Sequence, residues 1–233
     1  MEFTTPLIPA RLIRRYKRFL ADMILDDGRE VVAHCANPGS MLGLKEPGLR
    51  CWLEPNNDPK KKLRFGWRLV DHENGHFTGV DTTLPNRMLR KALEDRRISE
   101  LADFETLRAE VPYGKKSRVD FLLTDPEGKQ TYVEVKSVTL MRETGLAEFP
   151  DSVTTRGAKH MLDLAHMVEQ GHQAVVLFLV QRTDCQHVRI AADLDPDYAA
   201  AFSTAKAQGV KVLAYDCVVS PQSVSLGKKI SVL

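Results

Sequence analysis

The segment Ser117–Val138 constrains the fold more than any other part of the chain, because it has the pattern of a β-hairpin. Apolar and polar residues alternate in two runs, and a Pro-Glu-Gly turn separates the runs. Side chains at positions i and i+2 of a strand share a face. Glu134 and Lys136 are therefore expected to point the same way, and pairing of the two strands predicts Asp120 beside Glu134.

These three side chains suit metal-assisted hydrolysis of a phosphodiester. Asp120 and Glu134 would repel each other at close range unless Lys136 or a divalent cation neutralised them. Mg²⁺ or Mn²⁺ fits this role, because such hard cations bind one or two carboxylates together with water and phosphate oxygens. Lys136 would orient the metal-bound water or stabilise negative charge in the transition state. The alternative interpretation is a solvated strand face with a weak cross-strand ion pair.

Residues 1–81 are predicted to be mostly β-strand. An apolar stripe from Leu12 to Met23 also fits a helix, but Asp27-Gly28 lies between two strand-like runs and favours a hairpin. Several short strands separated by turns are typical of a small barrel of the oligonucleotide/oligosaccharide-binding (OB) kind. His34 is expected to be a buried structural histidine in this barrel.

Residues 82–233 show the pattern of a second, mixed α/β domain. Residues 82–86 are expected to be a linker in which Asn86 caps a helix that runs to about Arg97. With the hairpin, the order of elements is αβββαβ, which predicts strands sandwiched between helices. The other predicted elements are a strand at 104–112, a helix at 154–170, a fully buried strand Ala174–Val180, a helix at 196–209 and a last strand Lys211–Tyr215.

Composition excludes several classes of protein. The 33 Lys and Arg residues nearly balance 31 Asp and Glu residues, so nucleic-acid binding would depend on local clusters of positive charge. No C-x-x-C occurs among the four cysteines, which argues against a zinc site and indicates reduced thiols in a cytoplasmic protein. The longest apolar run, Ala174–Val180, is too short to span a membrane.

Two basic clusters lie in the region of the predicted barrel, and aromatic residues follow the second of them. Positive charge interleaved with rings suits single-stranded nucleic acid, because the charges follow the phosphates while the rings stack on bases. A solvated charged surface is the alternative for both clusters. The first cluster comprises Arg11, Arg14, Arg15, Lys17 and Arg18, and the second comprises Lys60, Lys61, Lys62 and Arg64, followed by Phe65 and Trp67.

Further candidates surround the predicted helix 154–170. Arg156 and Lys159 near its start, together with Arg182 after the buried strand, are expected to converge on a scissile phosphate. Each could instead be a surface residue. His160 is expected to be a structural partner rather than a base, and Asp151 is expected either to cap the helix or to support a metal ligand.

Asp120 with Glu134-Val135-Lys136, in an αβββαβ pattern, resembles the PD-(D/E)xK nuclease superfamily. That resemblance implies that Asp120 and Glu134 are metal ligands, that Lys136 is the catalytic lysine and that Glu94 on the first helix joins them. The whole chain also resembles the sugar fermentation stimulation protein A (SfsA) family. The residues that carry this second resemblance are His34–Met41, Pro59–Leu63, Trp67–Val70, Gly79–Asn86, Tyr113–Leu122, Tyr132–Leu140, Phe149–His160 and Gln181-Arg182.

The family resemblance implies an OB-like domain over residues 1–81, a nuclease-like domain over 82–233, DNA binding, and a link to the regulation of sugar, notably maltose, utilisation in bacteria. Three functions remain open. They are a Mg²⁺- or Mn²⁺-dependent DNA nuclease, a DNA-binding regulator that does not cut, and a metal- or nucleotide-binding scaffold. No helix-turn-helix signature is present. The choice between single-stranded and duplex DNA, and the formation of a homodimer, are also left open.

Overall fold

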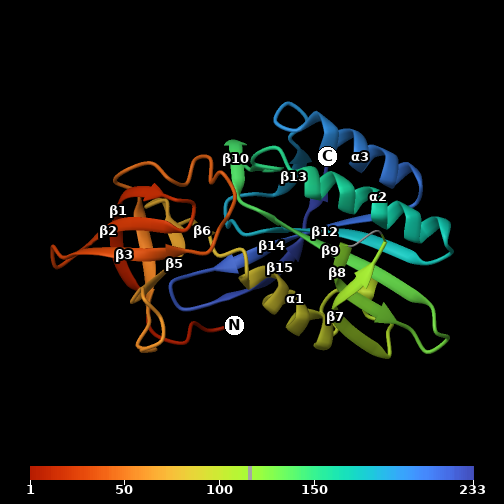
Figure 1. Ribbon diagram of the computed structural model, residues 1–233, viewed down its shortest axis with the longest axis horizontal. Coiled ribbons are helices and arrows are strands. Elements are labelled where there is room, and N and C mark those ends of the chain that lie inside the picture. The colour runs from red at the N-terminus through yellow and green to blue at the C-terminus, as the bar shows by residue number, and fades with distance from the viewer. Residues whose placement is uncertain (115–116) are drawn as a thin grey trace.

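A computed structural model, which describes residues 1–114 and 117–233, divides into a β-barrel and a larger α/β part (Figure 1). Five strands close the barrel in the order β1-β2-β3-β5-β4, and a parallel pairing of β3 with β5 completes the ring. The predicted OB-like barrel is confirmed. Its strands are β1 (Ile8–Tyr16), β2 (Leu20–Leu25), β3 (Glu30–Cys35), β4 (Arg50–Pro55) and β5 (Phe65–Asp71).

Small and large apolar side chains alternate inward to fill the barrel. Leu12 and Met23, which also fitted a helical stripe, lie opposite each other on β1 and β2 and are both buried in the barrel core. Trp67 on β5 is fully buried there as well. The β2–β3 hairpin turns at Asp27-Gly28, and Gly28 has φ +86°, a backbone conformation that L side chains rarely adopt.

Strand β6 (Phe77–Gly79) leads out of the barrel and joins it to the second part of the chain. The Gly79 amide donates to the carbonyl oxygen of Gln181 (2.8 Å), and Thr78 forms a β-bridge with Arg182. The Gln181 amide in turn donates to the carbonyl oxygen of Val138 (2.9 Å). The barrel is therefore tied by backbone hydrogen bonds to the central sheet of its neighbour.

The second part is built on a six-stranded sheet in the order β15-β14-β12-β9-β8-β7. Strand β12 lies between β9 and β14 and is parallel to both, and its residues are almost all buried, as its apolar run predicted. The strands are β7 (Thr106–Tyr113), β8 (Ser117–Thr124), β9 (Gln130–Val138), β12 (Gln173–Val180), β14 (Lys211–Val219) and β15 (Val224–Lys229).

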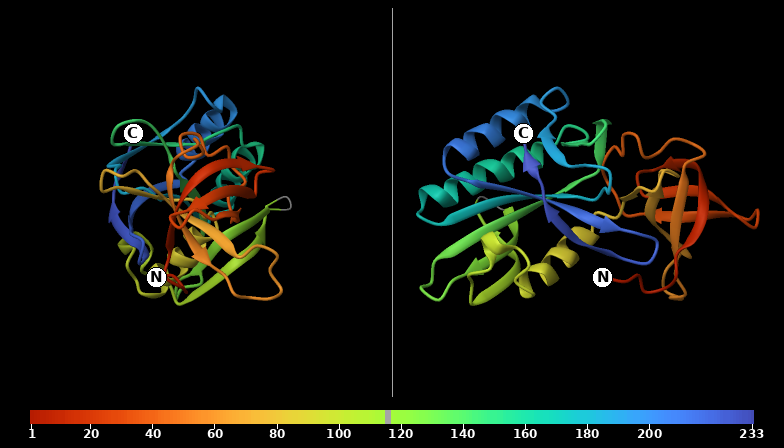
Figure 2. Two further views of the ribbon diagram at one scale, coloured as in Figure 1. Left: turned by 90° about the vertical axis from the view of Figure 1, so that its left-hand side faces the viewer. Right: turned by 180° about the vertical axis from the view of Figure 1, so that it is seen from behind.

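Helices cover both faces of this sheet, and Figure 2 shows α1 on the side opposite α2 and α3. The helices are α1 (Leu84–Glu94), α2 (Thr155–Glu169) and α3 (Pro196–Ala207), and a single 3-10 turn (Ser99–Leu101) follows α1. Helix α2 begins after Thr154, whose hydroxyl accepts the Gly157 amide hydrogen bond, and it ends before Gly171 at φ +87°. For the main sheet and its helices, the predicted αβββαβ order is confirmed.

A small four-stranded sheet lies beside the main one and was not predicted from the sequence. It has the order β10-β11-β13-β16, with strands β10 (Leu140–Glu143), β11 (Leu146–Phe149), β13 (His187–Ile190) and β16 (Ser231–Val232). The prediction of Lys211–Tyr215 as the last strand is wrong, because β15 and β16 follow it. These strands are short, and most of their partners lie far away in the sequence.

The four cysteines are buried and free, as their scattered positions predicted. No helix in the described ranges is both long enough and apolar enough to cross a membrane. The chain's first residues also contact the second part, because Glu2 forms a β-bridge with Ser223. The division into residues 1–81 and 82–233 stays a prediction.

Candidate active site

The hairpin strands β8 and β9 part at the two predicted acidic residues. Their pairing runs from Thr124 opposite Gln130 to Phe121 opposite Val133, and Asp120 and Glu134 are the next residues on each strand. Beyond the last pair, the carboxylate of Asp120 takes the place of a strand partner, and its Oδ2 accepts the Val135 amide hydrogen bond (2.7 Å). The regular pairing of the two strands therefore ends just before both carboxylates.

Glu134 is the buried centre of this site, with only 3% of its surface exposed. Its Oε1 accepts a hydrogen bond from Lys136 Nζ (2.8 Å) and also contacts Nδ1 of His160, which projects from α2. Nε2 of His160 lies 3.3 Å from Nε of Arg156. Because an arginine can only donate, that contact places the imidazole proton on Nδ1, where it points at Glu134.

The two carboxylates differ in pKa because their surroundings differ. Burial, followed by the charge of Glu134, raises the pKa of Asp120 to about 6, although hydrogen bonds from Val135 and Asn86 oppose the rise. Burial also acts to raise the pKa of Glu134, but hydrogen bonding by His160 and the charge of Lys136 outweigh it, so this pKa lies below its usual value.

The residues present fit a divalent cation. Oε2 of Glu134 is buried and has no hydrogen-bond partner among the described residues, which leaves a costly unsatisfied acceptor. The hydroxyl of Tyr113 is also buried without a partner, and burial and the charge of Glu134 raise its pKa. A hydrated cation held by Glu134 and Asp120 would satisfy such acceptors, since Mg²⁺ needs only one or two carboxylates.

Helix α1 contributes a residue to the site, but not the predicted one. The side-chain amide of Asn86 donates to Oδ1 of Asp120 (2.6 Å). The prediction that Asn86 caps the helix is wrong, because the helix begins at Leu84 and Asn86 lies inside its first turn. Glu94 lies two turns further along, exposed, and pairs with Arg90 (3.0 Å). The structure therefore does not bring Glu94 to the two carboxylates.

The three residues predicted to contact phosphate differ in exposure. Arg156 and Lys159 are exposed on the first turns of α2, and Lys159 donates to Ser117 Oγ (2.5 Å) and Asp163 (3.1 Å). Arg182 is buried and bound to Asp184 (2.7 Å) and to the carbonyl oxygen of Thr139 (3.1 Å). Arg156 and Lys159 lie on the same helix as His160, whereas the guanidinium of Arg182 is occupied by neighbours within the chain.

A loop of the barrel, residues 37–41, contributes its first three residues to the lining of a cavity that contains Lys136. The cavity has a volume of about 340 Å³. Arg15 donates to the carbonyl oxygens of Asn37 (2.7 Å) and Gly39 (3.0 Å), and this loop occupies its guanidinium. Asp151 accepts the Met41 amide hydrogen bond (2.9 Å), so Asp151 fastens the loop rather than capping α2.

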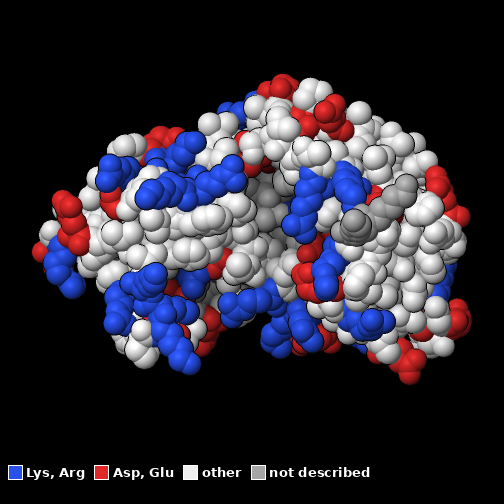
Figure 3. Space-filling model, in the orientation of Figure 1, with Lys and Arg blue, Asp and Glu red and all other residues white. Residues whose placement is uncertain are grey.

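The second basic cluster, Lys60, Lys61, Lys62 and Arg64, is exposed on the connection between β4 and β5. Figure 3 shows Lys and Arg side chains over the barrel and over the start of α2, on both sides of a hollow between the two parts of the molecule. Of the two aromatic residues expected to accompany this cluster, Phe65 is partly exposed and Trp67 belongs to the barrel core.

Sequence reasoning missed Asn86 and Tyr113 as neighbours of the acidic pair, and it did not specify the contact of His160 with Glu134. The sequence could have indicated the contact of His160. This residue lies five residues after Thr155 on a helix that crosses β9, and it is next to the buried face that Met161 and Leu164 mark. Asn86 gave no such signal, because an amide near a helix start is usually read as a cap.

Family models match the chain in two consecutive segments. Residues 13–80 match the SfsA N-terminal OB domain, and residues 83–223 match the sugar fermentation stimulation protein RE domain. The chain belongs to the SfsA family. The predicted family is confirmed, whereas the PD-(D/E)xK nuclease-like character of the second domain stays a prediction.

SfsA relatives match over almost their full length. The sugar fermentation stimulation protein homolog of Ruegeria pomeroyi is 67% identical over 97% of this chain and 98% of its own length. The homolog of Roseobacter denitrificans is 60% identical over 100% of this chain and 99% of its own length. The structure of Pyrococcus furiosus SfsA in complex with Ca²⁺ covers 100% of this chain and 98% of that one, at 26% identity and a TM-score of 0.89.

Proposed function

We propose that this SfsA protein is a divalent-metal-dependent nuclease that hydrolyses phosphodiester bonds in DNA. The observation that supports the proposal best is the buried Oε2 of Glu134, which has no hydrogen-bond partner among the described residues. The Ca²⁺ complex of the Pyrococcus furiosus relative supports a metal in this family. Asp120 and Glu134 would hold Mg²⁺ or Mn²⁺, and the bound ion would neutralise phosphate charge and acidify a water molecule.

The chain's own residues would prepare the reaction. His160 and Lys136 both donate to Oε1 of Glu134, so this carboxylate is held in one orientation with its Oε2 available. Lys136 lies on the wall of the cavity and would stabilise charge on the reacting phosphate. Arg156 and Lys159 are exposed on the same side of the sheet and would attract the phosphate backbone.

A cleavage assay with Mn²⁺ tests the proposal. Purified protein is mixed with single-stranded, duplex, nicked and branched DNA, and Glu134→Gln is compared with the unaltered chain. We expect cleavage to fall at least about 100-fold, because one of the two carboxylates loses its charge. DNA affinity measured in EDTA should change by less than about twofold, since Glu134 is buried and its partners Lys136 and His160 are buried as well.

Glu127→Gln is the matched control, because it makes the same chemical change at an exposed turn of the same hairpin. It should cut DNA as the unaltered protein does. If the unaltered protein with Mn²⁺ cuts none of the four DNA forms, the proposed nuclease activity is wrong.

The alternative function is a DNA-binding regulator of sugar (maltose) utilisation genes that does not cut. Helix α1 offers the amide of Asn86, not an acid, to Asp120. Among the described residues, no group of three or more His, Cys, Asp and Glu side chains could hold a metal ion. A footprint at a defined promoter without cleavage in Mn²⁺ would support this function over the nuclease.

A further inference from the structure

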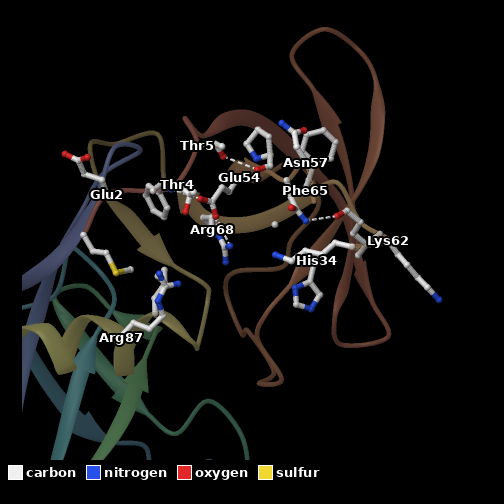
Figure 4. Close-up of a pocket in the computed structure, with 18 residues that line it drawn as sticks. Glu2, Thr4, Thr5, His34, Glu54, Asn57, Lys62, Phe65, Arg68 and Arg87 are labelled. Atoms are coloured by element: carbon white, nitrogen blue, oxygen red, sulfur yellow. Dashed lines mark hydrogen bonds and ion pairs between the residues drawn. The ribbon is translucent and has the colours of Figure 1, made fainter. Parts of the chain in front are cut away.

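A second, larger cavity lies between the barrel, the start of α1 and the first residues of the chain (Figure 4). Its volume is about 740 Å³, within the range of pockets that enclose a small ligand. It is distinct from the cavity that contains Lys136, since the two share no lining residue. Thr82 lines the smaller cavity and Leu84 the larger, so the linker before α1 separates them.

Positive side chains reach this cavity from three separate elements. In Figure 4, Arg68 from the barrel and Arg87 from α1 extend toward the same space, and Lys62 lies on the connection between β4 and β5. Arg68 is paired with Glu54 (2.7 Å) and with Asp81. Arg87 and Lys62 form no ion pair among the described residues, so their charge is available to an anionic ligand.

Aromatic rings lie on neighbouring barrel strands beside these charges. Phe65 on β5 and His34 on β3 line the cavity, and Phe65 is paired in register with the residue before His34. His34 is exposed, contrary to the prediction of a buried histidine. Its ring stacks on Phe19, with centroids 6.4 Å apart, and Phe19 is 45% exposed. Exposed rings on adjacent strands form a surface on which unpaired bases can stack.

We propose that this cavity binds an unpaired nucleotide of a DNA single strand. Arg87 would contact its phosphate, Lys62 on the opposite side of the cavity would contact a neighbouring phosphate of the strand, and the base would lie against Phe65 and His34. OB folds bind oligonucleotides across their second and third strands and the connection between their fourth and fifth strands. His34 on the third strand and Lys62 on that connection occupy such positions, and Phe65 begins the fifth strand beside them. A duplex does not fit, because its bases are already paired and stacked and offer no free ring face.

Two adjacent residues in the first turn of α1 connect the cavity with the candidate active site. Arg87 faces the cavity, and its neighbour Asn86 donates to Asp120. A strand anchored at Arg87 would therefore pass close to the acidic pair. This inference rests on the proposed function and names single-stranded DNA as the substrate of that site.

Fluorescence anisotropy in EDTA tests the inference without cleavage. The probes are a labelled oligothymidylate, a duplex of the same length and free thymidine monophosphate as competitor. We expect the single strand to bind at least about tenfold more tightly than the duplex, and the free nucleotide to compete only weakly. Arg87→Gln and His34→Ala, both at exposed positions that line the cavity, should each weaken single-strand binding by about tenfold.

Arg90→Gln is the matched control, since it removes one charge from the same helix outside the cavity, and it should change binding by less than about twofold. Equal or tighter binding of the duplex, competition by the free nucleotide as strong as by the strand, or unchanged binding in both variants would each overturn the inference. Cleavage without a preference for single strands would refute the inference alone. A preference for single strands without cleavage in Mn²⁺ would refute only the nuclease.

Discussion

At the scale of single residues, Asp120 carries the largest electrostatic cost of the candidate site. Its pKa is raised to about 6, against about 4 in an unfolded chain. A carboxyl group with a raised pKa destabilises the fold as pH rises through the interval between the two values, and the full cost is present above the higher one. The metal-free protein should therefore lose about 2–3 kcal/mol of stability from this group between pH 4 and pH 7.

Asp120→Asn should remove this cost. The new side chain can accept from the Val135 amide and donate to Asn86 if the Asn86 amide turns over. Urea unfolding in EDTA at pH 8 should show the variant to be more stable than the unaltered chain by up to about 3 kcal/mol, and the gain should vanish near pH 4. Mn²⁺ should stabilise only the unaltered chain. Equal stabilities at pH 8 would contradict the raised pKa.

At the scale of elements, one buried carboxylate holds the starts of two helices. Asp195 accepts hydrogen bonds from the amides of Tyr198 at the start of α3 (3.0 Å) and of Thr154 before α2 (2.7 Å). Asp195→Ala leaves both amides without this acceptor, so we expect a loss of about 2–4 kcal/mol in the free energy of unfolding. Urea denaturation monitored by circular dichroism measures this loss.

Thr154→Ala is the comparison for Asp195→Ala, because it removes a single cap bond, to the Gly157 amide (3.1 Å). Its cost should be about 1 kcal/mol. Similar losses in the two variants would show that Asp195 serves only one of the helices.

Regular elements with a strong local pattern could be predicted from the sequence, whereas short ones could not. The hairpin of β8 and β9, the helix α2 and the buried strand β12 each show a clear pattern of apolar residues. Each lies at the residues where that pattern predicted it. The strands β10, β11, β13 and β16 have four residues or fewer, too few to establish a period. Their existence depends on pairing with distant segments, as in the pairing of β11 with β13.

The candidate site, too, could be predicted only where a local pattern determines it. The common face of Glu134 and Lys136 follows from strand geometry alone, and so does the neighbouring position of Asp120. The contact of Asn86 with Asp120 depends on how α1 crosses the sheet, which no local pattern encodes. Arg182 was expected at the phosphate because it ends a central strand, but Asp184, two residues away, binds its guanidinium.

At the scale of the whole molecule, the two parts should unfold together. Both tryptophans, Trp52 and Trp67, lie in the barrel, while every described α-helix lies in the second part. Tryptophan fluorescence therefore reports the barrel, and circular dichroism at the helix band reports its neighbour. Because Asp151 and the contacts of β6 join them, we expect the two thermal transitions to coincide.

Asp151→Ala should separate the two transitions. The Met41 amide loses its acceptor, while the Ser40 hydroxyl keeps only its hydrogen bond to the Asp151 carbonyl oxygen (2.8 Å). The barrel should therefore unfold at a temperature a few degrees below that of the second part. Glu73→Ala, which removes an exposed ion pair with Arg11 inside the barrel, should leave the transitions together. Coincident curves in Asp151→Ala would mean that other contacts couple the two parts.

The edge strand β7 has a consequence for self-association. It ends the main sheet on one side, and its outer row of backbone groups could recruit another copy of the chain. Pro112 offers no amide hydrogen there, Glu110 has φ +54°, which twists the edge, and Arg108 adds charge. These features oppose continuous sheets between molecules. A homodimer, if one forms, should use another surface, and concentrated solutions should resist fibril growth along this edge.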